Sequence, residues 1–282
     1  MTVSARREAV RVMQGHGISE RRACRHLGIS ASVLRYVPRP DRNVELRQKV
    51  VALAQEHRRH GYRMIHWLLV TQGQRVNHKR VYRLYRQEDL SVRRRRRKLR
   101  AQSERVPLTR PLEPNEIWSM DFVMDQLADG RRLKCLTVLD DCSKESVAIA
   151  ADTSIPGGYV TRVLDAIAPQ RGLPKAIRVD NGPEFRSKAM AVWAYRNSVT
   201  LRFIQPGKPI QNAYIESFNG RFRDECLNEH WFTSMAHARA EISRWRSYYN
   251  ERRPHSALGY VPPAQFAAML RAREPGASQS VI

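Results

Sequence analysis

Three acidic residues lie in sequence settings that a solvated surface would not produce. Asp121 interrupts the apolar stretch 117–125, Asp180 directly follows the apolar segment 176–179, and Glu216 lies in the helix-patterned run 210–227. Carboxylate oxygens are the ligands that Mg²⁺ prefers, and two such ions about 3.5–4 Å apart can serve phosphodiester chemistry. We therefore predict that the three acids converge, bind Mg²⁺ or Mn²⁺ as two ions per active site, and cut or join DNA.

The pattern around these acids predicts the elements that position them. Residues 117–125 alternate as a strand, with Trp118 and Met120 on one face and Asp121 on the other. Strands are predicted also at 133–139, 146–150, 176–179 and 200–204, and helices at 156–168, 187–197, 210–227, 234–249 and 263–271. Three antiparallel strands followed by alternating strands and helices predict an α/β fold, a ribonuclease-H-like mixed five-stranded sheet flanked by helices.

The positive charge is concentrated before this region. The whole chain carries a net charge of +23, of which residues 1–110 contribute +20, from 28 Lys and Arg against 8 Asp and Glu. Such a distribution is typical of a polyanion-binding module joined to a domain that acts on the polyanion. Charge alone fits a ribosomal or membrane-surface protein equally well.

The basic front half reads as all-α, helix-turn-helix-type modules. Residues 1–38 predict helices at 4–14, 19–27 and 31–36, with a tight turn at Gly28. This order predicts a helix-turn-helix-like DNA-binding module, and the alternative is a small three-helix bundle that does not touch DNA.

A second helical DNA-binding module is predicted at 41–92, with helices at 44–57, 62–72 and 77–90. On its last helix Val81, Leu84 and Tyr85 recur at helical spacing, and the more polar side carries Lys79, Arg80 and Arg83. We predict that these three cations contact DNA; the alternative is a solvated helix face.

A basic and proline-containing linker is predicted at 93–114. The cations of this linker are expected to contact DNA phosphates without reading the base sequence. The alternatives are a localisation-type tract or an inert tether. The cations are Arg93, Arg94, Arg95, Arg96, Arg97 and Lys98. The catalytic core with its C-terminal helices is predicted at 115–272, and a flexible tail at 273–282.

The four cysteines, which form no C-x-x-C pair, argue against a zinc knuckle and a disulfide framework, and favour a reducing compartment. No apolar run of membrane-spanning length and no secretory leader is present, so no membrane partner and a cytoplasmic location are expected.

Four motifs in order carry a resemblance to a known family. They are WSMDFV at 118–123, DNGPEF at 180–185, NAYIESFN at 212–219 and YNERRPHSALGY at 249–260. The chain resembles the insertion-sequence DDE transposases with a retroviral-integrase-like core, as the second-reading-frame product of a two-frame bacterial element. HGYR at 60–63 and NHKRVYRL at 77–84 are similar to the helical domain before that core, so the resemblance covers about residues 40–270.

The resemblance implies a DNA transposase with Asp121, Asp180 and Glu216 as its catalytic and metal-binding triad. It implies binding of double-stranded element terminal inverted repeats and of target DNA, 3′-end cleavage and strand transfer, by a homo-oligomer on the bacterial nucleoid. The first-frame product, as partner or fusion, is also implied. Arg223, seven residues after Glu216, is expected to hold a DNA phosphate or to be solvated. Lys208 is expected to contact the substrate backbone, and the alternative is a loop lysine with no specific role.

Other polar residues near the motifs receive structural interpretations. Asn181 and Gly182 are expected to shape the turn after Asp180, and Glu184 to place its charge at the start of a helix. Asp140 and Asp141 are interpreted as turn residues, and His255 as a packing residue.

Two other functions fit parts of the sequence. A non-catalytic DNA-binding regulator would use the core as a dimerisation scaffold, and metal-dependent nicking of element ends would distinguish the two. A ribonuclease H-type nuclease suits neither the basic front half nor the Arg253-Pro254-His255 tail.

Overall fold

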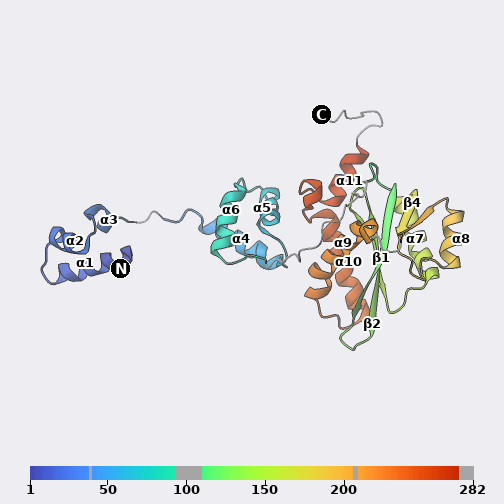
Figure 1. Ribbon diagram of the computed structural model, residues 1–282, viewed down its shortest axis with the longest axis horizontal. Coiled ribbons are helices and arrows are strands. Elements are labelled where there is room, and N and C mark those ends of the chain that lie inside the picture. The colour runs from blue at the N-terminus through green and yellow to red at the C-terminus, as the bar shows by residue number, and fades with distance from the viewer. Residues whose placement is uncertain (38–39, 93–109, 206–208, 273–282) are drawn as a thin grey trace. The chain divides into compact units, whose positions relative to one another are not determined.

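The computed structural model describes residues 1–37, 40–92, 110–205 and 209–272 (Figure 1). They form two compact units, Met1–Lys49 and Val50–Ile282. Most of the predicted basic linker, Lys208 and the tail fall outside the described residues, and these predictions stay as they are.

The first unit contains three short helices, α1 (Val3–Gly15), α2 (Glu20–Leu27) and α3 (Ala31–Arg35). The Thr2 side chain caps α1 by accepting a hydrogen bond from the Ala5 N–H. Gly28 ends α2 in the left-handed conformation, at a φ of 59°, which turns the chain toward α3. Val10, Ala23 and Cys24 form the small core of this unit. The three helices predicted at 4–14, 19–27 and 31–36 are confirmed.

Three further helices follow, α4 (Val44–Glu56), α5 (Tyr62–Thr71) and α6 (His78–Gln87). The Asn77 side chain caps α6 by accepting from the Lys79 N–H at 2.9 Å. One side of α6 is buried through Val81, Leu84 and Tyr85, as the spacing of these residues predicted.

The centre of the second unit is a five-stranded sheet of order β3-β2-β1-β4-β5. Its strands are β1 (Ile117–Gln126), β2 (Arg132–Asp140), β3 (Ser146–Asp152), β4 (Ala176–Val179) and β5 (Thr200–Phe203). The β1–β2 and β2–β3 pairs are antiparallel, and the β1–β4 and β4–β5 pairs are parallel. The predicted mixed sheet is confirmed, with β1 as its central strand.

Helices cover both faces of the sheet (Figure 1). On one face α7 (Gly157–Arg171) and α8 (Lys188–Arg196) pack over a cluster that includes Trp118 and Met120. On the other, α9 (Ala213–Glu225) and α10 (Met235–Glu251) pack over Val123 and Cys135, and α11 (Pro263–Arg271) packs against α10. The faces differ because side chains alternate along β1.

The helix predicted at 210–227 is shorter in the structure. A 3₁₀ turn at Pro209–Asn212 precedes α9, and a second at Leu227–Glu229 follows it. The backbone breaks at Asn212 (φ −108°, ψ 13°) and at Cys226 (φ −127°, ψ −64°), outside α-helical values. Glu216 therefore lies in the first turn of α9. No helix of the described ranges is long and apolar enough to cross a membrane.

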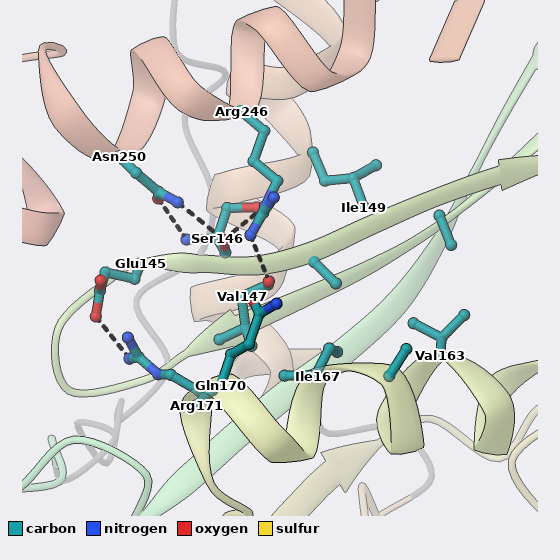
Figure 2. Close-up of a pocket in the computed structure, with 13 residues that line it drawn as sticks. Glu145, Ser146, Val147, Ile149, Val163, Ile167, Gln170, Arg171, Arg246 and Asn250 are labelled. Atoms are coloured by element: carbon teal, nitrogen blue, oxygen red, sulfur yellow. Dashed lines mark hydrogen bonds and ion pairs between the residues drawn. The ribbon is translucent and has the colours of Figure 1, made fainter. Parts of the chain in front are cut away.

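Side chains from α10 occupy the outer edge of β3, which is an edge strand of the sheet (Figure 2). Asn250 bonds both backbone groups of Ser146, at 2.8 and 3.0 Å, and Arg246 donates to the Ser146 and Val147 carbonyls at 3.0 and 2.8 Å. These contacts occupy backbone groups at the start of β3 that an exposed edge would offer to another strand.

Candidate active site

The strand pairing brings Asp121 and Asp180 side by side. In the parallel β1–β4 pair, Ser119 lies opposite Arg178, and two further steps along both strands reach Asp121 and Asp180. Residues opposite each other in neighbouring strands project to the same face. Asp121 and Asp180 therefore share the sheet face that α9 covers, just beyond the end of β4.

Asp121 is held by two donors. Its Oδ1 accepts from the Phe122 N–H at 2.8 Å, and its Oδ2 accepts from the Asn219 amide at 2.9 Å. Burial, with smaller contributions from the charges of Asp180 and Glu216, raises the pKa of Asp121 to about 6 against the lowering effect of both hydrogen bonds. Asp180 and Glu216 therefore both lie within electrostatic reach of Asp121.

The turn after Asp180 has little room. The Gly182 N–H donates to Asp180 Oδ1 at 2.9 Å, and a Cβ placed on Gly182 would lie 2.9 Å from that same oxygen. Asn181 donates to the Ile204 carbonyl at 2.9 Å, which ties the end of β4 to the chain beyond β5. Both residues shape this turn, as the sequence predicted.

Glu216 differs from the other two acids because its side chain is exposed. Within residues 1–37, 40–92, 110–205 and 209–272, no group of three His, Cys, Asp or Glu side chains is close enough to hold a metal ion. The donors nevertheless fit a hard divalent cation, since all three are carboxylates and their mutual repulsion is what a cation would relieve.

A buried ion pair lies beside these acids. Arg178, two residues before Asp180, binds Asp141 at 2.7 Å, and Ser119 donates to the same carboxylate at 2.7 Å. The Arg178 charge is therefore engaged by Asp141 and does not neutralise the triad acids. Asp140 closes the predicted turn by accepting from Cys142 and Ser143 N–H groups, at 2.9 and 3.0 Å.

Glu184 has a different partner from the one predicted. Helix α8 begins only at Lys188, and Glu184 forms an ion pair with the buried Lys134 of β2 at 2.5 Å. The Lys134 ammonium also lies 4.0 Å from the centroid of the Phe122 ring, which stacks on Phe185. The interpretation of Glu184 as a helix-start charge is wrong, because its charge anchors the loop after Asp180 to β2.

The predicted DNA-contacting cations that the structure describes are all exposed. Arg223, on α9, donates to the Met124 carbonyl at 3.3 Å, beyond Asp121 on β1. Lys79, Arg80 and Arg83 lie on the exposed side of α6. Their DNA contacts remain predictions, as do those of the basic tract at 93–98 and of Lys208.

Sequence reasoning gave no role to Asn219 or Thr137. Asn219 donates to Asp121, and its Oδ1 accepts from the Thr137 hydroxyl at 2.9 Å. Helical spacing holds a signal for Asn219, since it follows Glu216 by three residues and such residues share a helix face. Thr137 offered none, because its position opposite Asp121 follows from strand pairing alone.

A cavity of about 470 Å³ lies elsewhere, between β3, α7 and α10 (Figure 2). Its lining includes Ile149, Val163 and Ile167 but none of the three acids. The Arg171–Glu145 ion pair at 2.6 Å, together with Arg246 and Asn250, occupies its polar side. We interpret this cavity as a gap in the packing of α7 and α10 at the sheet edge, separate from the candidate active site.

Fold and site together define the integrase-core class, and similarity to known proteins agrees. The integrase core domain family matches residues 111–209 and, in a second form, 197–263. The HTH-like domain family matches residues 41–98. A simian T-cell lymphotropic virus intasome, solved in complex with PP2A regulatory subunit B56 gamma, has a chain of the same fold. Its TM-score is 0.55 at 14% identity, over 82% of this chain and 79% of that one.

Relatives from bacterial insertion elements are closer in sequence. The uncharacterized 31.7 kDa protein of insertion element IS407 from Burkholderia multivorans is 59% identical, over 94% of this chain and 97% of its own length. The 39.2 kDa protein of IS476 from Xanthomonas euvesicatoria is 54% identical, over 95% and 78%. The transposase of IS904 from Lactococcus lactis is 27% identical, over 78% and 92%. The chain belongs to the insertion-sequence DDE transposases with an integrase core, a family of polynucleotidyl transferases that acts in DNA transposition.

Proposed function

We propose that this chain binds the terminal inverted repeats of its element, frees their 3′ ends and joins those ends to target DNA. Asp121, Asp180 and Glu216 act as the catalytic triad and hold Mg²⁺ or Mn²⁺, two ions per site. The observation that carries the proposal is the placement of the three acids: Asp121 and Asp180 share the sheet face that α9 covers, and Glu216 lies in the first turn of α9.

The proposed reaction has two steps. Water attacks a phosphodiester at the element end, and the 3′ oxygen leaves as a hydroxyl. That hydroxyl then attacks a phosphodiester of the target, so one P–O bond forms as another breaks. The bound ions would supply Lewis-acid activation of the attacking and leaving oxygens.

The chain's own residues set the geometry of these steps. Asp121 and Asp180 present carboxylates from adjacent strands, and Glu216 approaches from α9. Arg223 is suited to a phosphate, because it is exposed and its guanidinium meets the backbone of β1 at Met124. The exposed cations of α6 and the basic tract at 93–98 would position the duplex.

Assembly is part of the same proposal. Two element ends must be paired, which two or more copies of this chain on DNA would achieve, on the nucleoid and alone or with the first-frame product. The exposed Lys79, Arg80 and Arg83 are assigned to end binding.

Glu216→Gln tests the triad. Labelled duplexes carrying the element end are incubated with the full chain and Mg²⁺ or Mn²⁺, and nicking and gel-shift binding are measured together. We expect Glu216→Gln to abolish nicking and to leave end binding unchanged. Asp224→Asn is the matched control, since Asp224 is an exposed acid of the same helix. Normal nicking by Glu216→Gln would refute the assignment, and binding without nicking by the wild-type chain would favour a regulator.

A further inference from the structure

Asn219 links Asp121 to the helix that carries Glu216. Its amide Nδ2 donates to Asp121 Oδ2 at 2.9 Å, across 98 positions of sequence. Asn219 lies three residues after Glu216 on α9, so the two side chains leave the same side of the helix. This hydrogen bond therefore connects Asp121 of β1 directly to α9, the helix that carries Glu216.

Thr137 contacts the other end of the Asn219 amide. Its hydroxyl lies 2.9 Å from Asn219 Oδ1 and 3.1 Å from the Asp121 backbone carbonyl, and β2 places Thr137 directly opposite Asp121. A carboxamide has an accepting and a donating end. The ionised Asp121 carboxylate only accepts, so Asn219 turns its N–H groups to Asp121, and the Thr137 hydroxyl stabilises this orientation by donating to the amide oxygen.

These contacts decide which part of the Asp121 carboxylate stays available. An ionised carboxylate has about four lone-pair sites on its two oxygens. The Phe122 N–H engages one oxygen and the Asn219 amide the other, which fixes the plane of the group and leaves sites on both oxygens. A carboxylate oriented in advance binds a cation with less loss of rotamer freedom.

We propose that Asn219 is a positioning residue for Asp121, and that Thr137 acts through it by stabilising the orientation of the amide. The inference rests on the proposed function, because it assumes that Asp121 is a metal ligand. Asn219 touches neither substrate nor reacting atoms in this role. Its effect is on how tightly and in which orientation the Asp121 side of the site takes a divalent cation.

Mn²⁺ binding to the DNA-free full chain, measured by electron paramagnetic resonance of the free ion, tests this. We expect Asn219→Leu, which keeps the branching of the side chain and removes both hydrogen bonds, to weaken Mn²⁺ binding about 10-fold or more. Thr137→Val, which loses only the hydroxyl, is expected to weaken it by a smaller factor, and Thr137→Ser to restore wild-type binding. Wild-type Mn²⁺ affinity in Asn219→Leu, or equal losses in Thr137→Val and Thr137→Ser, would overturn the proposal.

A double variant tests whether Thr137 acts through Asn219. If it does, adding Thr137→Val to Asn219→Leu causes no further loss of Mn²⁺ affinity. An additive loss would show that Thr137 does not act through Asn219. Circular dichroism melting confirms that each variant is folded before binding is measured.

Asp121→Asn separates this inference from the proposed function. If Asp121→Asn leaves Mn²⁺ affinity unchanged, the assignment of Asp121 as a ligand fails. If Asp121→Asn weakens binding and Asn219→Leu does not, only the positioning role fails.

Discussion

The strand-borne acids and the helix-borne acid of the candidate site are built differently. Asp121 and Asp180 project from adjacent strands, and backbone N–H groups of Phe122 and Gly182 engage their carboxylates. Glu216 is exposed in the first turn of α9. Two acids are therefore held in place by the fold while the third remains adjustable, so we expect a cation to complete its ligand set from the helix side.

Replacing one acid from each side gives the largest expected effect. Asp121→Asn and Glu216→Gln should each lower element-end cleavage by about 10³-fold or more, because the three acids act as a unit and the loss of one disables the others. In metal-free buffer, Asp121→Asn should melt at a higher temperature than the wild type, because it removes a buried charge beside two other carboxylates. Glu216→Gln should melt as the wild type does. Equal melting temperatures for the two variants would remove the contrast between the two sides.

The packing beneath Glu216 gives the next effect. Phe218 of α9 is 2% exposed, and its ring centroid lies 5.7 Å from that of Trp245 and 5.0 Å from that of Tyr249. Phe218→Ala should lower the free energy of unfolding by about 3–5 kcal/mol in a denaturant titration. Tyr195→Ala, at a side chain that is 89% exposed, is the control and should change it by about 0.5 kcal/mol or less. A small effect of Phe218→Ala would mean that α9 is loosely held as a whole.

The loop after Asp180 provides a test on the strand side. Lys134→Met should lower the free energy of unfolding by about 1–3 kcal/mol, because it leaves Glu184 without its partner in a partly buried place. Adding Glu184→Gln should recover part of this loss, which a double-mutant cycle measures. Strictly additive losses would show that the pair does not anchor the loop.

The smallest expected effect is on the pH dependence of stability, through His255, which packs against Tyr249 of α10. Burial, with the nearby Arg221 and Arg253, lowers the pKa of His255 to about 3, and its ring packs edge-on against Tyr249. Below a pH of about 6.5, His255 binds a proton in the unfolded chain, whereas in the folded chain it binds one only near pH 3. The folded state is therefore less stable as the pH falls through this window. The slope for one proton is about 1.4 kcal/mol per pH unit. His255→Gln should reduce the slope by about half that amount at pH 6.5 and by nearly all of it at pH 5 in denaturant titrations, whereas an unchanged slope would place the proton uptake elsewhere.

Much of the strand side could be predicted from the sequence, and the connections between elements could not. The alternation in 117–125 and the apolar segment before Asp180 predicted both strands, because such patterns depend on local burial. The bonds from Asn219 to Asp121 and from Lys134 to Glu184 join residues 98 and 50 positions apart. No local pattern encodes such pairs, and for this reason Glu184 was assigned to a helix start.

The same limit applies to the entry of α9. Its hydrophobic spacing predicted a helix from 210, but the backbone enters α9 only after the 3₁₀ turn that ends at Asn212. Such a break depends on backbone angles that hydrophobic periodicity does not report.

The position of Asp121 on a central strand constrains the length of the chain as strictly as its chemistry. Deleting or inserting one residue between Ile117 and Asp121 would exchange the two faces of the strand, turning the carboxylate into the apolar layer around Trp118 and Met120. A change of two residues would keep the face but carry Asp121 away from Asp180. Homologous enzymes should therefore tolerate many substitutions in this short segment and hardly any change in its number of residues.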